Sequence, residues 1–171
     1  MGRGGALLRA FATALFVFGT DQGIKALVEG SLRVGEGMTL VPGFLSLTHI
    51  KNDGGAFGIL GGSQALLLAG SAVAVGVVLW MLLSGPGSGA ATYGCGLILG
   101  GAAGNLLDRL IAGDVVDFLD LEFWPLRQWP VFNAADVAIV LGVAVLFLAA
   151  LRPERAGQQS TAASDRGKAE S

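Results

Sequence analysis

Apolar residues are gathered into four long runs, which cover about residues 7–28, 64–83, 90–111 and 131–151. A helix rises about 1.5 Å per residue, so a run of about 20 residues is long enough to cross the hydrocarbon core of a bilayer. In lipid, the backbone N–H and C=O groups of a spanning segment must be satisfied within it, which favours helices. The pattern therefore predicts a mainly α membrane protein with four transmembrane helices.

The segment between the first two runs, about residues 31–62, is different. Leu45–Ile50 alternates in side-chain character, and Asn52–Gly55 has the composition of a turn. We expect a small extracytoplasmic β-sheet here, between helices 1 and 2. His49, the only histidine, should be an exposed strand residue, and it has no ligand partner at metal-site spacing. The sequence predicts no metal.

Small residues repeat in the third run, where Gly96, Gly100 and Gly104 recur every four residues. On a helix this spacing places them on one face, which lets a neighbouring helix approach closely. We expect that face to pack against another span.

The overall composition agrees with a membrane protein. The chain of 171 residues is 53% hydrophobic and 14% charged, with a mean hydropathy of +0.65, whereas soluble domains carry about 25% charged residues. A net charge of −2 without a basic stripe excludes a nucleic-acid partner. The single cysteine, Cys95, cannot form an internal disulfide and is predicted to be a small buried side chain.

The distribution of basic residues predicts the orientation. The N-terminal end and the C-terminal tail together carry six Lys and Arg residues, against three in the segments 29–63 and 112–130. The positive-inside rule then places both termini in the cytoplasm. Residues 1–151 would form the four-helix domain, and residues 152–171 a disordered cytoplasmic tail. The first run lacks a small-x-small cleavage site at its end, so we expect it to be retained as a helix.

Two carboxylates lie at the margins of the last two runs, Asp117 and Asp136. A carboxylate at the centre of a bilayer costs about 2.5–3.5 kcal/mol, so such residues usually have a function. A hairpin of the third and fourth helices can bring the two face to face, where they would share a proton and act as acid and base. Asn133, three residues before Asp136, could orient it. Proton-relay carboxylates of a transporter, a structural helix cap or a non-catalytic binding module also fit this spacing.

Further polar residues fall at the same outer ends of the helices. Asp21 and Lys25 are four residues apart, and Asn105 shares a helix face with Asp108 and Arg109. Ion pairing at helix ends would explain both sets, and we expect Arg109 to pair with a carboxylate. The gathering of these residues predicts a site at the outer interface of the membrane.

Five motifs occur in order between about Phe11 and Leu151. They are Asp21-x-x-x-Lys25, Asn52-x-Gly54-x-Ala56-Phe57, Gly104-Asn105-Leu106-Leu107-Asp108-Arg109, Gly113-x-Val115-Val116-Asp117-Phe118 and Phe132-Asn133-x-Ala135-Asp136. Together they closely resemble the lipoprotein signal peptidases (signal peptidase II), a family of four-helix bacterial aspartyl proteases.

The resemblance implies an aspartic endopeptidase of the bacterial inner membrane, with its active site near the outer face. It would remove signal peptides from diacylglyceryl-modified prolipoproteins by cutting just before the lipidated cysteine, without a cofactor or a required protein partner other than the substrate. Asp117 and Asp136 match the catalytic dyad, and Asp21 and Lys25 a supporting polar pair. The positions that match substrate-binding and site-shaping residues are Asn52, Gly54, Asn105, Arg109, Asn133 and Ala135. Residues 31–62 resemble the family's β-cradle, and Leu119–Pro130 its substrate-covering loop. Trp124 and Trp129 in this loop could cover the bound lipopeptide.

Overall fold

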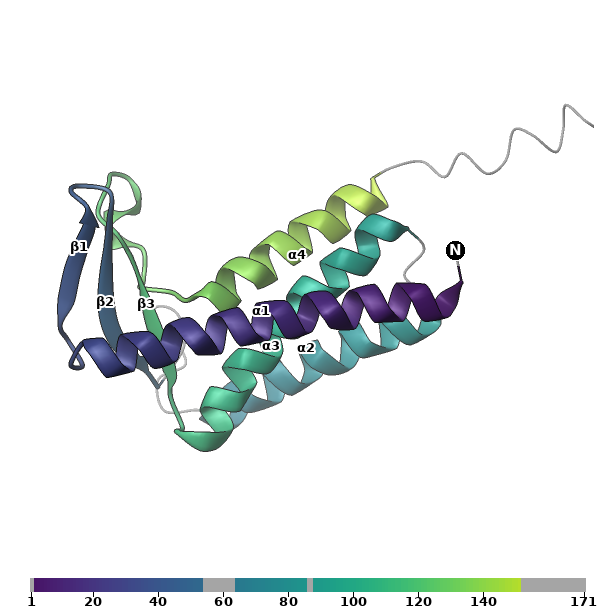
Figure 1. Cartoon of the computed structure of the whole chain (residues 1–171), viewed down its shortest axis with the longest axis horizontal. Helices are drawn as coiled ribbons and strands as arrows, with labels where there is room; N and C mark the ends of the chain where they lie inside the picture. Colours follow the sequence, from purple (N-terminus) through teal and green to yellow (C-terminus); the bar gives the residue numbers. More distant parts are fainter. Residues whose placement is uncertain (1, 54–63, 86–87, 152–171) are drawn as a thin grey trace, which may run out of the picture.

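The computed structural model describes residues 2–53, 64–85 and 88–151. The long helices lie side by side, and a small sheet lies at one end of the bundle, as Figure 1 shows. The helices are α1 (Arg3–Ser31), α2 (Gln64–Ser84), α3 (Gly89–Ile111) and α4 (Ala134–Ala150). The strands are β1 (Gly37–Val41), β2 (Leu45–Asn52) and β3 (Val115–Leu121), and a short 3-10 helix, η2, covers Leu126–Gln128. The four predicted helical segments are confirmed.

Helix α3 is the centre of the bundle and packs against each of the other three helices. Its glycine face makes this possible. A Cβ on Gly96 would lie 2.6 Å from the Ala10 carbonyl oxygen of α1, and a Cβ on Gly100 would lie 2.5 Å from that of Ala14. The predicted close approach along this face is therefore confirmed, because no larger residue fits between the two backbones.

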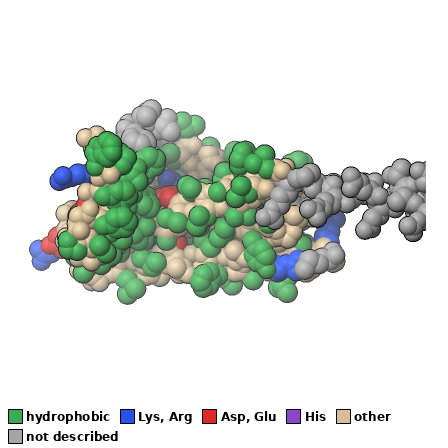
Figure 2. Space-filling model, turned by 90° about the horizontal axis from the view of Figure 1, so that it is seen from above, with side chains coloured by type: hydrophobic (Ala, Val, Ile, Leu, Met, Phe, Trp, Pro, Cys, Tyr) green, Lys and Arg blue, Asp and Glu red, His purple; other side chains and the backbone are tan. Residues whose placement is uncertain are grey.

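The outer surface of the bundle is apolar. Ala65–Ser84 and Gly89–Ile111 are long and apolar enough to cross a membrane, with mean hydropathies of 2.5 and 1.2. Only 11% of the α2 segment is buried by the rest of the protein, so its apolar side chains face outwards. Figure 2 shows hydrophobic side chains over the bundle and the sheet. A surface of this kind is stable in lipid rather than water, and the protein is a membrane protein.

The three strands form an antiparallel sheet in the order β1-β2-β3. Strands β1 and β2 come from the predicted region, but β3 follows α3 and was not predicted. Asp117 therefore lies on a strand, and the expected loop Leu119–Pro130 contains the end of β3 and the helix η2. The Val115–Phe118 segment is buried at every position, so it lacks the alternation by which a half-exposed strand is recognised.

The sheet is anchored to the end of α1 by apolar and polar contacts. Val28 of α1 packs with Val116 and Phe118 of β3 in one buried cluster. His49 is only 3% exposed, and its Nδ1 donates to the Leu32 carbonyl oxygen at 2.9 Å. The expectation of an exposed His49 was wrong. The β2–β3 register is irregular between Leu47 and Ile50, so simple alternation does not hold there.

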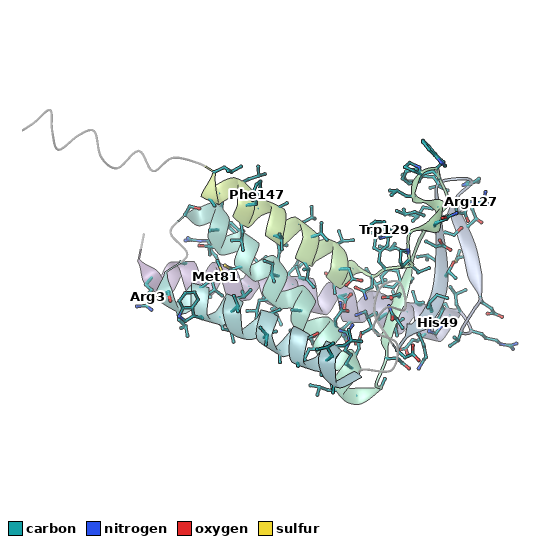
Figure 3. The ribbon with its side chains drawn as sticks, turned by 180° about the vertical axis from the view of Figure 1, so that it is seen from behind. Arg3, His49, Met81, Arg127, Trp129 and Phe147 are labelled. Atoms are coloured by element: carbon teal, nitrogen blue, oxygen red, sulfur yellow. The ribbon has the colours of Figure 1, made fainter. Side chains whose placement is uncertain are left out.

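Both described ends of the chain lie away from the sheet. Figure 3 places Arg3 and Phe147 at one end of the bundle, and His49 and Trp129 at the other. Consecutive helices therefore run up and down, and the polar ends of α1, α3 and α4 meet beside the sheet (Figure 1).

Candidate active site

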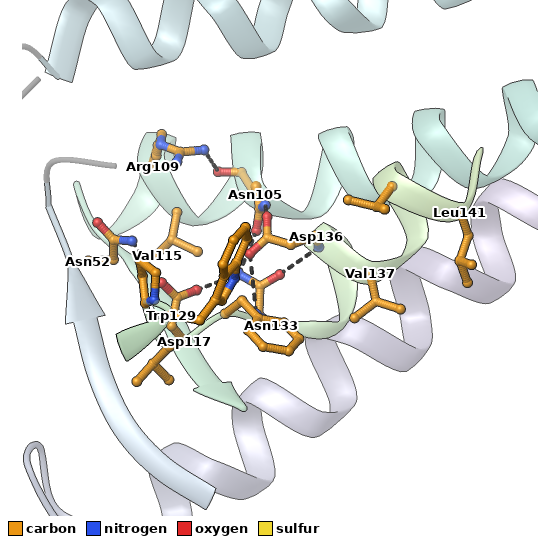
Figure 4. A pocket seen from close by; sticks show the side chains of 14 residues that line it. Asn52, Asn105, Arg109, Val115, Asp117, Trp129, Asn133, Asp136, Val137 and Leu141 are labelled. Carbon is orange, nitrogen blue, oxygen red and sulfur yellow. Dashed lines mark hydrogen bonds between the residues drawn. The ribbon is translucent and has the colours of Figure 1, made fainter. Parts of the chain in front are cut away.

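Asp117 and Asp136 line the same cavity, which has a volume of about 400 Å³ and lies where the sheet meets the helices. Asp117 comes from β3 and Asp136 from the first turn of α4, and Figure 4 shows them beside Asn133 and Asn105. The remaining lining residues are Asn52, Arg109, Val115, Trp129, Pro130, Val131, Phe132, Val137, Val140 and Leu141. The cavity thus has a polar floor and an apolar wall.

Asn133 holds the two carboxylates in one arrangement. It is the N-cap of α4, where its Oδ1 accepts from the Asp136 backbone N–H at 2.9 Å and its own N–H donates to Asp136 Oδ2 at 3.2 Å. This reciprocal capping box satisfies donors that every helix start leaves free. The Asn133 Nδ2 also donates to Asp117 Oδ1 at 2.7 Å, and the residue is fully buried. One side chain therefore both starts the helix and couples the two acids.

Two further asparagines complete the shell around the acids. Asn52 Nδ2 donates to Asp117 Oδ2 at 2.7 Å, and Asn105 Nδ2 donates to Asp136 Oδ1 at 2.9 Å. Each carboxylate oxygen of the pair thus accepts a hydrogen bond from an asparagine. Such bonds fix the orientation of both carboxylates and stabilise their charged forms.

Asp117 is only 3% exposed, and this burial disfavours the charged form of its carboxyl group. Desolvation is the largest influence and raises the pKa of Asp117 from 3.8 to about 6, with the charge of Asp136 adding to the rise and the bond from Asn52 opposing it. A carboxyl group with a pKa near neutrality can both hold and release a proton under physiological conditions.

A buried charge cluster lies behind the acids, between α1 and α3. The Lys25 ammonium lies 2.7 Å from Asp21 Oδ2 and 2.6 Å from Asp108 Oδ2, and it donates to Asn105 Oδ1 at 3.0 Å. The other oxygen of Asp21 accepts from the Ala135 backbone N–H at 2.9 Å. The first and last helices are joined at this point, one residue before Asp136.

Arg109 forms part of the cavity wall. Its Nη1 donates to the Asn105 carbonyl oxygen at 3.2 Å and to Ser71 Oγ of α2 at 3.4 Å. The expectation that it pairs with a carboxylate was wrong for the residues that the structure describes. Arg109 instead connects α2 to the site and leaves a cation beside the cavity.

Most of the sequence-predicted site residues come together. Asn52, Asn105, Arg109 and Asn133 line the cavity with the two acids, whereas Asp21, Lys25 and Ala135 lie behind it. Gly54 lies outside the described residues. No group of three or more His, Cys, Asp or Glu side chains suited to a metal ion occurs within residues 2–53, 64–85 and 88–151.

Sequence reasoning missed two parts of the site. The apolar wall of Val137, Val140 and Leu141 was not identified, although its three- and four-residue spacing from α4 was a usable signal. The link from Gln22 Nε2 to Asp108 Oδ1, at 2.8 Å, was also missed. It depends on how α1 and α3 are rotated against each other, which no local pattern specifies.

Comparisons with family models and with known sequences point to the same family as the sequence motifs. The model of the family "Signal peptidase (SPase) II" matches residues 13–152. A lipoprotein signal peptidase from Halothermothrix orenii is 40% identical over 147 residues, which cover 86% of this chain and 98% of the relative. One from Gloeobacter violaceus is 43% identical over 143 residues, covering 82% of this chain and 80% of the relative.

The fold comparison agrees. A solved bacterial membrane enzyme is similar to this structure with a TM-score of 0.78 at 26% identity, covering 88% of this chain and 92% of that one. A second bacterial membrane enzyme structure gives a TM-score of 0.75 at 27% identity, covering 84% of this chain and 92% of that one. With a family match over most of its length, the chain belongs to the signal peptidase II family.

Proposed function

We propose that this protein is an aspartic endopeptidase that removes signal peptides from diacylglyceryl-modified prolipoproteins, cutting just before the lipidated cysteine. The observation that carries this proposal is the pair Asp117 and Asp136, which line one cavity and are both hydrogen-bonded by Asn133. Relatives named lipoprotein signal peptidases supply the substrate class.

In the proposed reaction, one carboxyl of the pair is ionised and the other carries the shared proton. The ionised carboxylate takes a proton from water as the water oxygen attacks the scissile carbonyl, and the protonated partner donates to the carbonyl oxygen. As the tetrahedral intermediate collapses, the pair donates its proton to the nitrogen of the cysteine and the C–N bond breaks, while one hydroxyl of the intermediate returns its proton to the pair. The products are a free carboxyl and a free amine, and the pair returns to its starting protonation.

The shape of the cavity supports a lipid-bearing substrate. Val137, Val140 and Leu141 extend from the acids along α4 and are 38%, 67% and 53% exposed. Acyl chains attached to a cysteine would lie along this apolar wall while the peptide bond rests at the polar floor. Trp129 lines the same cavity (Figure 4), where it would cover a bound peptide.

The arrangement in the membrane is part of the proposal. All four helices span the bacterial inner membrane, residues 1–151 form one peptidase domain, and residues 152–171 form a cytoplasmic tail that lies outside the described residues. The sheet and the acids then lie near the outer face. The excess of basic residues at the two chain ends supports this orientation, as does the position of Arg3 and Phe147 away from the sheet. Membrane lipids and the prolipoprotein are the only partners that the proposal requires.

The decisive experiment is cleavage of a purified diacylglyceryl-modified prolipoprotein by the native chain, Asp117→Asn and Asp136→Asn in detergent. Each substitution should lower the rate by about 100- to 10,000-fold, because it removes a proton-transfer group while keeping the shape of the side chain. Asp120→Asn is the matched control, since Asp120 lies on the same strand outside the acid cavity and accepts from Thr48 Oγ1 at 3.0 Å. It should cleave at the native rate.

Thermal unfolding of each variant separates lost chemistry from lost folding. A native rate in either cavity variant would exclude Asp117 and Asp136 as the dyad. A folded native protein that cleaves no lipidated precursor would reject the peptidase proposal itself.

A further inference from the structure

Asn105 stands between the acids and the buried lysine, and its side-chain amide has two unlike ends. Its Nδ2 donates to Asp136 Oδ1 at 2.9 Å, while its Oδ1 accepts from Lys25 Nζ at 3.0 Å and from Asn133 Nδ2 at 3.1 Å. An amide nitrogen only donates and an amide oxygen only accepts. Which end faces Asp136 therefore decides whether that carboxylate gains a hydrogen bond or meets a lone pair.

Lys25 determines that orientation. An ammonium group has three donors and no acceptor, so only the oxygen of Asn105 can face it favourably. Its charge also polarises the amide, which strengthens the hydrogen bond that Nδ2 gives to Asp136. Asn133 donates to the same oxygen but carries no charge. The lysine therefore makes the larger contribution to holding the amide in place.

Asp108 keeps the lysine at this position. The Lys25 side chain is 3% exposed, and a buried cation is stable only with anionic partners. Asp108 supplies one of these from α3, at 2.6 Å, and Gln22 Nε2 donates to its other oxygen at 2.8 Å. Asp21 supplies the second, but one of its oxygens is also used by the Ala135 N–H. Both oxygens of Asp108 thus contact side chains of α1, namely Lys25 and Gln22. Asp21 instead divides its oxygens between Lys25 and the backbone of α4.

We propose that Lys25 and Asp108 form a positioning pair, which fixes the amide of Asn105 so that its Nδ2 faces Asp136 and sustains the ionised form of that carboxylate. This inference rests on the proposed function, because it assigns the pair a role in the same dyad. Neither residue lines the cavity, and the pair reaches Asp136 through Asn105. The charged groups around this network are Asp21 and Lys25 of α1, Asp108 and Arg109 of α3, Asp117 of β3 and Asp136 of α4.

The inference has a specific consequence for pH dependence. Without the ammonium, the Asn105 amide can turn its oxygen towards Asp136, and that contact is favourable only when Asp136 carries a proton. In the variant, Asp136 is then protonated at a pH at which it is still ionised in the native enzyme. In Lys25→Met, the acidic limb of kcat/KM should move up by about one pH unit, and kcat at neutral pH should fall about 10-fold with KM changed less than about twofold.

The test compares Lys25→Met, Asp108→Asn, Asn105→Ala and the double variant Lys25→Met/Asn105→Ala, using a diacylglyceryl-modified prolipoprotein across pH. Asp108→Asn retains the lysine and should move the acidic limb in the same direction by a smaller amount. If the lysine acts through Asn105, the double variant should be no slower than Asn105→Ala alone. Lys51→Met is the matched control, because Lys51 pairs with Asp114 at 3.7 Å on an exposed surface. It should keep the native profile.

A pH profile that stays unchanged in Lys25→Met, or losses that multiply in the double variant, would overturn the proposal. If Lys25→Met does not fold, the pH profile of Asp108→Asn tests the same role, and an unchanged profile there overturns it equally.

The side-chain amide signal of Asn105 in ¹⁵N-labelled protein provides a readout that does not depend on turnover. It should shift in Lys25→Met or Asp108→Asn and not in Lys51→Met. An unchanged signal would overturn the positioning role even if the native protein cleaves nothing. Failure of the native protein or activity of Asp136→Asn would instead reject the proposed function.

Discussion

At the scale of single residues, Asp117 shows how burial and hydrogen bonding oppose each other at one carboxyl. The residue is buried on β3, and its two oxygens accept from Asn52 and Asn133. Burial is the larger effect and raises the pKa of Asp117 to about 6. The protein therefore retains a proton at this position at a pH where an exposed aspartate has lost it.

This shift predicts how stability depends on pH. Between pH 3.8 and about 6, the folded protein holds a proton on Asp117 that the unfolded chain has released. The contribution of Asp117 to stability is therefore greatest at low pH and falls as the pH rises through this range. Asp117→Asn removes the titration, so its free energy of unfolding relative to the native chain should increase from pH 4 to pH 7, by up to about 3 kcal/mol.

Thermal or denaturant unfolding at both pH values measures this difference. The same measurement on Asp120→Asn corrects for the loss of a charge on the same strand. If the free energies of unfolding of the native chain and Asp117→Asn differ by the same amount at both pH values, burial does not raise the pKa of Asp117.

The structure brings Asp117, Asn133 and Asp136 together at one cavity, and the sequence singled them out because such residues are rare in apolar segments. Asp117 and Asp136 were identified because carboxylates at the margin of long apolar runs are costly, and Asn133 because of its spacing from Asp136. The partners of Lys25 could not all be predicted, since Asp108 meets it from another helix at a rotation that no local pattern encodes. His49 was misread because an irregularity in strand register reverses the expected side of the strand.

At the scale of elements, the start of α4 is both a helix terminus and part of the proposed active site. Replacing Asn133 with Ala removes the cap and the bond to Asp117 together. We expect the free energy of unfolding to fall by about 1–2 kcal/mol and the cleavage rate by at least about 10-fold.

Ser88→Ala offers a matched comparison, because Ser88 caps α3 through a bond from the Ala91 N–H at 3.1 Å, and the cavity lining does not include it. It should cost about 1 kcal/mol of stability without slowing cleavage. Equal losses of activity in the two variants would mean that Asn133 acts only as a cap.

The contact between α3 and α4 predicts a second effect at this scale. A Cβ on Gly101 would collide with the carbonyl oxygen of Ala135, directly before Asp136. Gly101→Ala should displace the start of α4 and lower kcat by about 10- to 100-fold, since small misplacements of reacting groups are costly.

The control for that contact is Gly19→Ala on α1, where an added Cβ would meet nothing within 4 Å. It should leave cleavage unchanged and slightly stabilise the helix. Native activity in Gly101→Ala would show that α4 can shift without disturbing the acids.

The helices were predictable and β3 was not, for a physical reason. A long apolar run is a local signal that identifies a helix in a membrane protein, although α1 extends beyond the predicted 7–28 to cover Arg3–Ser31. Strand β3 is short and has no regular alternation of buried and exposed positions. Its partner, β2, lies far earlier in the chain, as the pairing of Ile50 with Asp117 shows. Its strand character arises from that pairing.

At the scale of the whole molecule, the two ends of the bundle should face opposite sides of the membrane. Cys95 is fully buried, so the native chain should react poorly with a membrane-impermeant maleimide. Leu40→Cys on β1 should be labelled in spheroplasts, whereas Gly4→Cys at the start of α1 should be labelled only in inverted vesicles. Both positions are exposed in the structure. Labelling of the two sites from the same side would contradict the proposed orientation.

The bond between Asp21 and the backbone of Ala135 has a consequence for biosynthesis. It joins residues 114 positions apart, so the site is complete only after the last helix has been synthesised and packed against the first. While the ribosome is still adding residues, Asp117 has no partner acid and the lysine cluster has no α4 to support. The proposed proteolysis would therefore begin only in a finished, inserted chain, and an incomplete copy would not cut precursors that enter the membrane beside it.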